Sequence, residues 1–591
     1  MDCAHFEETR LNRPLITHLI IWVSLLSTVF IVSPSLWNQT VAGKYFYFAA
    51  VVAVATLVTA YRLFRRRAAF RICLTDVAVF CLMAWIGFSC AINRTPSGMN
   101  LWIFILLIPL YVTIRASLHD RNMIRPLLWV IMMAVTVEAI WGLLQLHGVL
   151  KSYHSVFAIS GSFFNPGPYA GFLACGIPLA LHCLLSGRAK AEKFLGFACL
   201  ITAGLILPAT MSRAAWLAIV AGGAPVIIRQ LKIKKTVLFV FAGIFIVGAF
   251  LGLHAFKKSS IDGRLLIWRV SANIVSEKPL TGSGLGSFQV RYDGSQADYF
   301  LSKKVSEKQR MIADTPEYAF NEYVQITVEH GIIGLLLFLG VIYSLFARSS
   351  LDSTIQKFSD SKIAVNGSLI TFLVFAFFSY PFSMLGLTVL FVVLLAMSAS
   401  LSQPVERLTS RWSGTIAGIL CLVMAGFACV EILSRYTAYR EWKSAQAMYN
   451  IGYFEDTIDN YRRLYPKMNR QKQFLFEYAR CLSATGKYKA GNEMLVRYLS
   501  FGSDPAVYNS MGENYKKMGD YENAEKMYFR ASQIVPSRHY PLYLLMNMYK
   551  ESEQIEKAKN MATILLEKPV KVPSKAITEI QEEARELKME N

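Results

Sequence analysis

The residues of this 591-residue chain best suited to chemistry lie in one long polar segment, residues 255–331. Cations dominate as far as Arg291, and carboxylates dominate from Asp293 onward. A guanidinium forms paired, charge-assisted hydrogen bonds with a diphosphate, and a carboxylate can accept a proton. This charge order predicts an anion-binding wall facing a proton-accepting wall, and the alternative is a solvated loop of mixed charge. The candidate residues are Arg264, Arg269, Lys278, Arg291 and Glu322, with Asp314, Glu317 and His330 as further possible proton acceptors.

Two motifs lie inside this segment. The first is GSGLG (282–286), which follows a predicted helix that Pro279 stops. No strand precedes it and no helix clearly follows, so it is not a nucleotide-binding signature. The second is AFNEYVQITVEHGIIG (319–334), a predicted helix that carries Asn321 and is broken at Gly331 before the next apolar stretch.

The elements that position these residues are membrane spans. Windows of about 19 residues show one apolar stretch after another from Pro14 to Val430, and about 20 apolar residues let a helix cross a bilayer. We expect an all-α polytopic domain over residues 1–433 with twelve or thirteen spans. The candidate spans are 15–34, 45–63, 73–92, 100–115, 126–146, 168–186, 194–211, 214–229, 236–254, 332–347, 363–381, 383–402 and 413–433.

The orientation follows from the basic residues of the short loops, which prefer the cytoplasm. With Met1 inside, twenty such residues face the cytoplasm and four face outward. This bias predicts a multi-pass protein of the bacterial cytoplasmic membrane whose first span is an anchor and whose 255–331 loop is periplasmic. Thirteen spans, an odd number, also place the tail after Val430 outside. That count depends on dividing residues 363–402 into two spans at Tyr380-Pro381.

The formal net charge of +21 is explained by this topology, so the sequence does not indicate a nucleic-acid partner. No metal-ligand spacing and no disulfide framework is present. Three polar residues of the membrane region are candidates for function. Glu138 and Gln145 are seven residues apart and share one helix face, and Arg213 is one of the few outward cations. The alternative for Arg213 is an arginine that reaches lipid headgroups from a span end.

Residues 434–591 form a polar tail with a repeat. The stretch PAVYNSMGENYKKMGDYENAEKMYFRASQIVP (505–536) carries the spaced aromatic, glycine and alanine residues of a tetratricopeptide, and matching residues recur 33 or 34 positions away. We therefore expect a periplasmic α-solenoid of about four repeats. Such an array can bind a protein partner, or it can only rigidify or dimerise the chain.

Five segments in order resemble the O-antigen ligase and polymerase superfamily of bacterial envelope glycosyltransferases, which also includes protein O-oligosaccharyltransferases. They are EAIWGLLQ (138–145), GSFFNPGPYAGFLA (161–174), SRAAWLA (212–218), the stretch from Arg264 to Phe288, and NEYVQITVEHGIIG (321–334). The resemblance spans the membrane region and its large periplasmic loop. Tetratricopeptide tails are similar to those on some branches of the superfamily.

The resemblance implies a membrane glycosyltransferase that uses a glycan carried on undecaprenyl diphosphate, without cofactor or metal. Arg213 and Arg264 match the arginines thought to hold the diphosphate, and Asn321 matches the polar position that begins the helix before the next span. Gln145 and Asn165 are further candidate substrate-binding residues within the matching segments. Membrane lipids and an acceptor, either lipid A core or a protein, are the implied partners.

The chain departs from the superfamily at the position before Asn321. A histidine thought to activate the acceptor is common there, and this chain has Phe320. The usual Asn-Pro-Asn is Asn165-Pro166-Gly167. Transfer from a lipid diphosphate needs stabilisation of the leaving charge and removal of a proton from a hydroxyl acceptor. We expect Glu322 to accept this proton, or the enzyme to have no dedicated base.

Three enzymatic outcomes stay open at this level. Ligation to lipid A core is the first expectation, followed by glycan polymerisation and protein O-glycosylation. A non-catalytic scaffold or a transporter is the alternative of another class. A transporter predicts self-similar halves, which the sequence lacks, and a scaffold has no need of Arg213 or Arg264.

Overall fold

The computed structural model describes residues 15–66, 71–95, 98–231, 258–302, 305–347, 358–403 and 413–589. These residues form helices and no strand, which confirms the all-α class. Ten described helices are long and apolar enough to cross a membrane, and Leu15–Phe30 and Leu385–Ser400 are shorter apolar helices. Twelve of the thirteen expected spans coincide with these helices, and the remaining one, 236–254, lies outside the described residues.

The membrane helices alternate with short connections. Residues 363–402 form two helices, because the turn η4 (Pro381–Ser383) separates α15 from α16. The division at Tyr380-Pro381 on which the span count depended is therefore confirmed. The bounds are α2 Ala42–Arg66, α3 Leu74–Ile92, α4 Met99–Ser117, α5 Ile124–Leu146, α6 Pro166–Ser186, α7 Lys190–Ile206, α8 Arg213–Leu231, α13 Glu322–Phe346, α15 Ser359–Phe377, α16 Leu385–Ser400 and α17 Ser413–Leu433.

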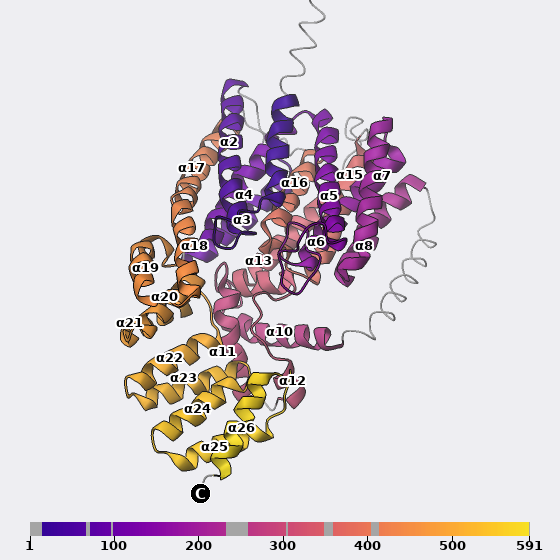
Figure 1. The fold of residues 1–591 in the computed structure, drawn as a ribbon. Coiled ribbons are helices and arrows are strands. Elements are labelled where there is room, and N and C mark those ends of the chain that lie inside the picture. The colour runs from indigo at the N-terminus through magenta and orange to yellow at the C-terminus, as the bar shows by residue number, and fades with distance from the viewer. Residues whose placement is uncertain are drawn as a thin grey trace, which may run out of the picture.

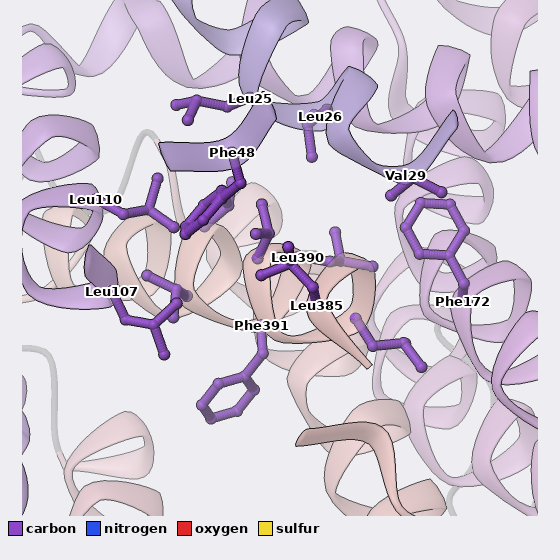
Figure 2. Close-up of a cluster of buried hydrophobic side chains, with 14 of the residues drawn as sticks. Leu25, Leu26, Val29, Phe48, Leu107, Leu110, Phe172, Leu385, Leu390 and Phe391 are labelled. Atoms are coloured by element: carbon purple, nitrogen blue, oxygen red, sulfur yellow. The ribbon is translucent and has the colours of Figure 1, made fainter. Parts of the chain in front are cut away.

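The centre of the membrane region is α16, and every residue of this helix is buried. It contacts α3, α4, α6 and α15. Figure 2 shows Leu390 and Phe391 of α16 among Leu25, Phe48 and Leu107 from the surrounding helices. A helix that is apolar on all sides belongs in such a core, because each of its faces can be buried against other helices.

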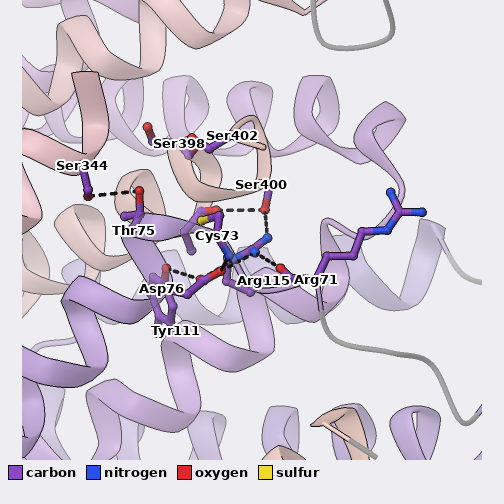
Figure 3. A network of polar contacts seen from close by, with 11 residues as sticks. Arg71, Cys73, Thr75, Asp76, Tyr111, Arg115, Ser344, Ser398, Ser400 and Ser402 are labelled. Atoms are coloured by element: carbon purple, nitrogen blue, oxygen red, sulfur yellow. Dashed lines mark hydrogen bonds and ion pairs between the residues drawn. The ribbon is translucent and has the colours of Figure 1, made fainter. Parts of the chain in front are cut away.

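A buried ion pair ties α3 to α4 within this core. The Arg115 guanidinium lies 2.7 Å from the Asp76 carboxylate, and neither side chain is more than 8% exposed. Tyr111 donates to the same carboxylate at 2.6 Å, and Arg115 donates to the hydroxyl of Ser400 at 2.9 Å (Figure 3). Every charge in this network has a partner, as burial of ions requires.

The polar segment between α8 and α13 contains three described helices, α10 (Lys258–Glu277), α11 (Ser287–Ser302) and α12 (Glu307–Ile312). The sequence predicts α10, whereas after the glycine-rich turn it indicates no clear helix, and the structure shows α11 there. The reason is that α11 is only weakly amphipathic and is stabilised by packing. Its Phe288, Tyr292 and Phe300 join Leu266 and Val270 of α10 in a separate hydrophobic cluster.

The tail forms paired helices. Gly452, Gly486 and Gly519 each adopt a positive φ at a turn between helices, and their spacings are 34 and 33 residues. Glycine adopts this conformation without a steric penalty, which explains its recurrence. The assignment to tetratricopeptides stays a prediction. The helices are α18 Tyr436–Asn450, α19 Phe454–Met468, α20 Lys472–Ala484, α21 Tyr488–Leu499, α22 Pro505–Lys517, α23 Tyr521–Ile534, α24 Tyr540–Glu551, α25 Ile555–Glu567 and α26 Lys575–Met589.

The tail and the polar segment lie together at one end of the membrane helices (Figure 1). Helix α11 packs against α23, and Gln296 donates to the carbonyl of Ile534 at 2.7 Å. Among the described residues, four apolar helices, α13, α15, α16 and α17, separate the two regions in sequence, and four crossings would return the chain to the same side. Which side of the membrane this is stays a prediction.

The acidic part of the polar segment faces the tail. Asp298 pairs with Arg530 at 2.9 Å, Asp314 with Arg538 at 3.4 Å, and Glu317 with Lys472 at 3.2 Å. These three carboxylates of the expected proton-accepting wall thus face cations of the tail, whose charges complement them.

Candidate functional site

The framework of the site is a kink in α13. Gly331 has φ 71° and ψ −176°, which divides the helix into Glu322–His330 and a longer apolar part. The glycine-rich turn docks against this kink: Ser283 N–H donates to the Val328 carbonyl at 3.0 Å, and Gly284 N–H to the Glu329 carbonyl at 2.7 Å. A Cβ on Gly282 would lie 2.4 Å from the Glu329 carbonyl carbon. The glycines thus permit contact between two backbones.

The short helix before the kink begins at Asn321. Its side chain accepts hydrogen bonds from the N–H groups of Tyr323 at 2.9 Å and Val324 at 3.2 Å, which is N-capping. The next residue, Glu322, is 2% exposed, and its carboxylate accepts a hydrogen bond from the Phe382 N–H at 2.7 Å. The cap of Asn321 and the turn η4 therefore fix the position of the Glu322 carboxylate.

Phe320, which the resemblance predicts to stand in place of a superfamily histidine, comes just before the cap Asn321. Its φ is +52°, a region that is unfavourable for a residue with a large side chain. The Arg264 guanidinium lies 5.6 Å from the Phe320 ring centroid, and the ring of Tyr380 meets Phe320 edge-on at 5.3 Å. Such contacts hold the strained backbone, and strain of this kind is concentrated at functional sites.

Arg264 and Arg213 form a pair of like charges. Burial and then the positive charge of Arg213 lower the pKa of Arg264. Within the described residues, neither arginine forms an ion pair with a carboxylate. Two neighbouring guanidinium groups without a counter-charge make a site with a strong preference for an anion. The positive charge of Arg213, 51 positions earlier in the sequence, thus acts on Arg264.

The other cations predicted from the polar segment lie elsewhere. Arg269 is exposed on α10. Arg291 pairs with Glu277 at 2.6 Å, and Lys278 donates to the Asn93 side chain at 2.8 Å. Arg291 and Lys278 thus have partners of their own, and Arg269 lies five residues after Arg264 on the same helix.

Gln145 and Asn165 have internal roles. The Gln145 side chain accepts from the N–H groups of Ser160 and Gly161 at 2.9 and 2.8 Å, and Asn165 accepts from Gly167 N–H at 2.9 Å as the cap of α6. Glu138 accepts hydrogen bonds from Ser162 in the same loop. The sequence analysis proposed Gln145 and Asn165 for substrate binding, and the structure shows them holding the α5–α6 connection in place.

Two aromatic residues of this region were missed by the sequence analysis. Tyr318 stacks on Tyr380 with ring centroids 4.3 Å apart, so that Phe320, Tyr380 and Tyr318 form an aromatic row. Burial raises the pKa of Tyr380 to about 12. Tyr380 comes from the turn between α15 and α16, 60 residues after Phe320, and no local sequence pattern indicates that contact. Among the described residues, no group of His, Cys, Asp and Glu side chains is arranged to hold a metal ion.

Comparison with known proteins points to one superfamily. Residues 197–339 match the family model described as O-antigen ligase, a range that contains Arg213, Arg264, Phe320 and Glu322. Two curated proteins, each named "Putative polysaccharide ligase", are similar to part of the chain. The protein of Rickettsia conorii (strain ATCC VR-613 / Malish 7) is 36% identical over 87 residues, which is 15% of this chain and 20% of that protein.

The second relative is from Rickettsia bellii (strain RML369-C) and is 40% identical over 83 residues, or 14% of this chain and 18% of that protein. The chain therefore matches about a fifth of the length of these curated relatives. The matching family model covers the arginine pair, the glycine-rich turn and the kinked helix. These findings support the O-antigen ligase superfamily for the membrane region and a membrane ligase or glycosyltransferase as its class of activity.

Proposed function

We propose that this protein transfers a glycan from a polyisoprenyl diphosphate, of the undecaprenyl type, to an acceptor at the periplasmic face of the cytoplasmic membrane. The observation that carries the proposal is Arg264, a partly buried cation that lies 5.6 Å from the Phe320 ring centroid, feels the positive charge of Arg213 and has no ion pair with a carboxylate among the described residues. A diphosphate supplies the missing negative charge, and paired hydrogen bonds from guanidinium groups suit its oxygen atoms.

The transfer needs two kinds of assistance. The acceptor hydroxyl oxygen attacks the anomeric carbon of the glycan, and the bond from that carbon to the diphosphate oxygen breaks. The diphosphate departs with the bonding electron pair, and the two arginines stabilise its charge. Glu322 accepts the proton of the acceptor hydroxyl, because the Phe382 N–H holds its carboxylate at the start of the helix that follows Phe320.

Gene deletion followed by separate analysis of envelope glycans tests the reaction. Under the proposal, full-length lipid-linked chains accumulate and the lipopolysaccharide loses its ladder of bands. Single lipid-linked units would instead indicate a polymerase, and bare glycoproteins would indicate a protein O-oligosaccharyltransferase. Unchanged glycans in all three fractions would contradict the proposal and favour a non-catalytic scaffold. Complementation with wild-type protein and with the Arg229→Ala variant, changed at the opposite end of α8, is the control.

A further inference from the structure

A chamber of about 700 Å³ lies between the membrane helices and the tail. Its volume is within the range of pockets that bind small molecules and cofactors. The deep part is apolar and is formed by α3, α4, α13 and α16. Its lining there includes Val79, Met83, Phe104, Leu107, Phe391 and Leu395.

The chamber follows the membrane helices over a long distance. Its lining extends from Val79 on α3 to Asn93, the residue after that helix, and on α4 from Met99 to Tyr111. At a rise of about 1.5 Å per residue these stretches are roughly 20 Å long, or about two thirds of the hydrocarbon thickness of a bilayer. At the deep end the Tyr111 hydroxyl bonds to Asp76 in the buried ion-pair network (Figure 3). A hydrocarbon chain is the ligand that suits such a space.

The mouth of the chamber is polar and is built in part by the tail. Arg470, Gln471 and Lys472 at the start of α20, with Ser500 and Phe501 after α21, belong to its lining. The facing groups come from the membrane region and the polar segment. They include Trp37, Asn38, Asn93, Gln289 and Tyr318. Amide, hydroxyl and charged groups beside aromatic rings suit a headgroup that carries many hydroxyls.

The tail also holds the segment that enters the site. We call residues 313–321 the strap. Lys571 donates to the Ala313 carbonyl at 3.3 Å, Arg538 to the Asp314 carboxylate at 3.4 Å, and Lys472 to Glu317 at 3.2 Å. Three cations from three parts of the tail thus contact three strap residues, Ala313, Asp314 and Glu317, just before Tyr318 and Phe320. Both members of the pair Lys472–Glu317 line the chamber.

The aromatic row connects the chamber to the arginine pair. Tyr318 lines the chamber, Phe320 contacts Arg264, and Tyr380 contacts both aromatic residues. Glu322 also belongs to the chamber lining, whereas Arg213 and Arg264 do not. The carboxylate that would accept a proton from the acceptor therefore lies on the chamber side, and the cations that would hold the donor diphosphate lie at the other end of the row.

We infer that the chamber binds the acceptor, that the acceptor is an amphipathic glycolipid, and that the tail is part of the acceptor site. The hydrocarbon chain lies between α3, α4, α13 and α16. The saccharide headgroup lies at the mouth between the start of α20 and the strap, where one of its hydroxyls reaches Glu322. This inference rests on the proposed function for the role of the ligand as acceptor, but lipid binding in the chamber can be measured without transfer.

Photolabelling of the full-length protein in lipid nanodiscs tests the occupant. The probe is an alkyl maltoside with a diazirine in its alkyl chain, and labelled peptides are identified by mass spectrometry. We expect labelling at Met83, Phe104 and Phe391, and competition by unlabelled alkyl maltoside. Labelling equal to that of the exposed apolar residues Val423 and Phe427 of α17 would overturn the inference. Competition by undecaprenyl phosphate alone would also overturn it, because the chamber would then take the donor.

Charge exchange at the mouth tests the part played by the tail. Lys472→Glu and Glu317→Lys each place like charges side by side, and the double exchange restores the pair. We expect each single variant to raise the probe concentration for half-maximal labelling and the acceptor KM about tenfold, with kcat and the donor KM unchanged. The double variant should recover most of this loss. Phe501→Ala is a second variant at the mouth, and we expect it also to raise the probe concentration for half-maximal labelling and the acceptor KM.

The control exchange is Lys526→Glu with Glu522→Lys, an exposed pair on α23 with a separation of 2.6 Å that does not line the chamber. Equal losses in the control, or a fall in kcat with both KM values unchanged, would overturn the role of the tail in acceptor binding. Labelling without any transfer would contradict the proposed function and leave the lipid site intact. Transfer without labelling in the chamber would contradict the lipid site and leave the proposed function intact.

Discussion

Two sites with arginines in this protein differ in how their charges are satisfied. Arg115 is buried beside Asp76 and also donates to Ser400 and to the Arg71 carbonyl (Figure 3). Arg264 lies near Arg213, whose charge lowers its pKa, and its described neighbours are aromatic rings. The first site is complete without a ligand, whereas the second has an excess of positive charge that an anionic ligand would balance.

The role of a polar residue in a membrane region can be inferred only when its hydrogen-bond and ion-pair partners are known. Ionisable residues in spans are functional candidates by default. In this protein Asp76, Arg115, Glu138 and Gln145 satisfy one another or nearby backbone groups, so they stabilise the fold. Arg213 at the start of α8 and Arg264 in α10 form no ion pair with a carboxylate among the described residues, so they stay candidates for chemistry.

The largest expected effect is on stability at the complete site. Arg115→Ala leaves the Asp76 carboxylate buried without its partner, and removal of one member of a buried pair costs about 3–5 kcal/mol. We expect poor accumulation in the membrane and a lower unfolding temperature of the purified protein in detergent. Arg229→Ala is the control, because its pair with Asp360 is about half exposed on both sides and such pairs contribute about 0–1 kcal/mol. An equal loss of stability in Arg115→Ala and Arg229→Ala would show that the buried pair of Arg115 and Asp76 contributes no more than an exposed pair.

The next effect concerns the proton acceptor. Glu322→Gln keeps the size of the side chain and its hydrogen bond from Phe382 N–H but removes the basic carboxylate. We expect transfer to fall about 10²–10⁴-fold, the usual contribution of a general base, whereas Phe320→Leu should lose much less. The measurement is transfer in vitro from purified lipid-linked donor across a pH series. An unchanged transfer rate and pH profile in Glu322→Gln would show that Glu322 is not the proton acceptor. The mechanism would then rest only on stabilisation of the departing diphosphate by the two arginines.

Phe320→His is the companion to this variant, because it restores the residue common in the superfamily. We expect its transfer rate to equal or exceed that of the wild type. In the background of Glu322→Gln it should recover activity, since an imidazole can accept the proton. Failure to recover would show that the position of residue 320 is unsuited to proton transfer in this chain.

A smaller effect is expected where the polar segment meets the tail. Burial and then the charge of Asp504 raise the pKa of Asp293 on α11 to about 8, with Arg538 and Lys472 lowering it and Asp314 raising it. Between about pH 4 and 8 the folded state holds a proton that the unfolded state has released, so stability falls as the pH rises through this range. Asp293→Asn should remove this dependence. Hydrogen exchange of the α11 amides at pH 6 and 8.5, corrected for intrinsic exchange rates, measures this pH dependence of stability. The same pH dependence in Asp293→Asn and in the wild type would contradict the role of Asp293.

The sequence predicted most of the membrane architecture because its signals are local. Apolar length identified twelve helices, and Tyr380-Pro381 marked the break between α15 and α16. Gly331 marked the kink in α13 because no other residue adopts its conformation at low cost. Helix α11 escaped prediction, because its stability comes from contacts with α10 and α23 that are distant in the sequence.

The candidate site was predictable only in part. Arg213 and Arg264 could be chosen from the resemblance and from the orientation of the loops, but their proximity depends on how α8 and α10 pack. Asp314 and Glu317 suggested chemistry by residue type, and the structure pairs both with the tail. The sequence did not reveal the internal hydrogen bonds of Gln145 and Asn165, since an amide that binds nearby backbone groups and one that binds a ligand have the same sequence signature.

The glycan-transfer rates of arginine variants test whether Arg213 and Arg264 hold the donor diphosphate. Arg213→Ala and Arg264→Ala, compared with Arg229→Ala at equal membrane abundance, are assayed with a purified polyisoprenyl-diphosphate-linked glycan. We predict that both variants lose transfer by about 10²-fold or more while Arg229→Ala retains it, because charge stabilisation at a leaving group is worth several kcal/mol. Arg264→Lys should recover little, since a point charge lacks the paired geometry of a guanidinium. Full activity in both alanine variants would contradict the account.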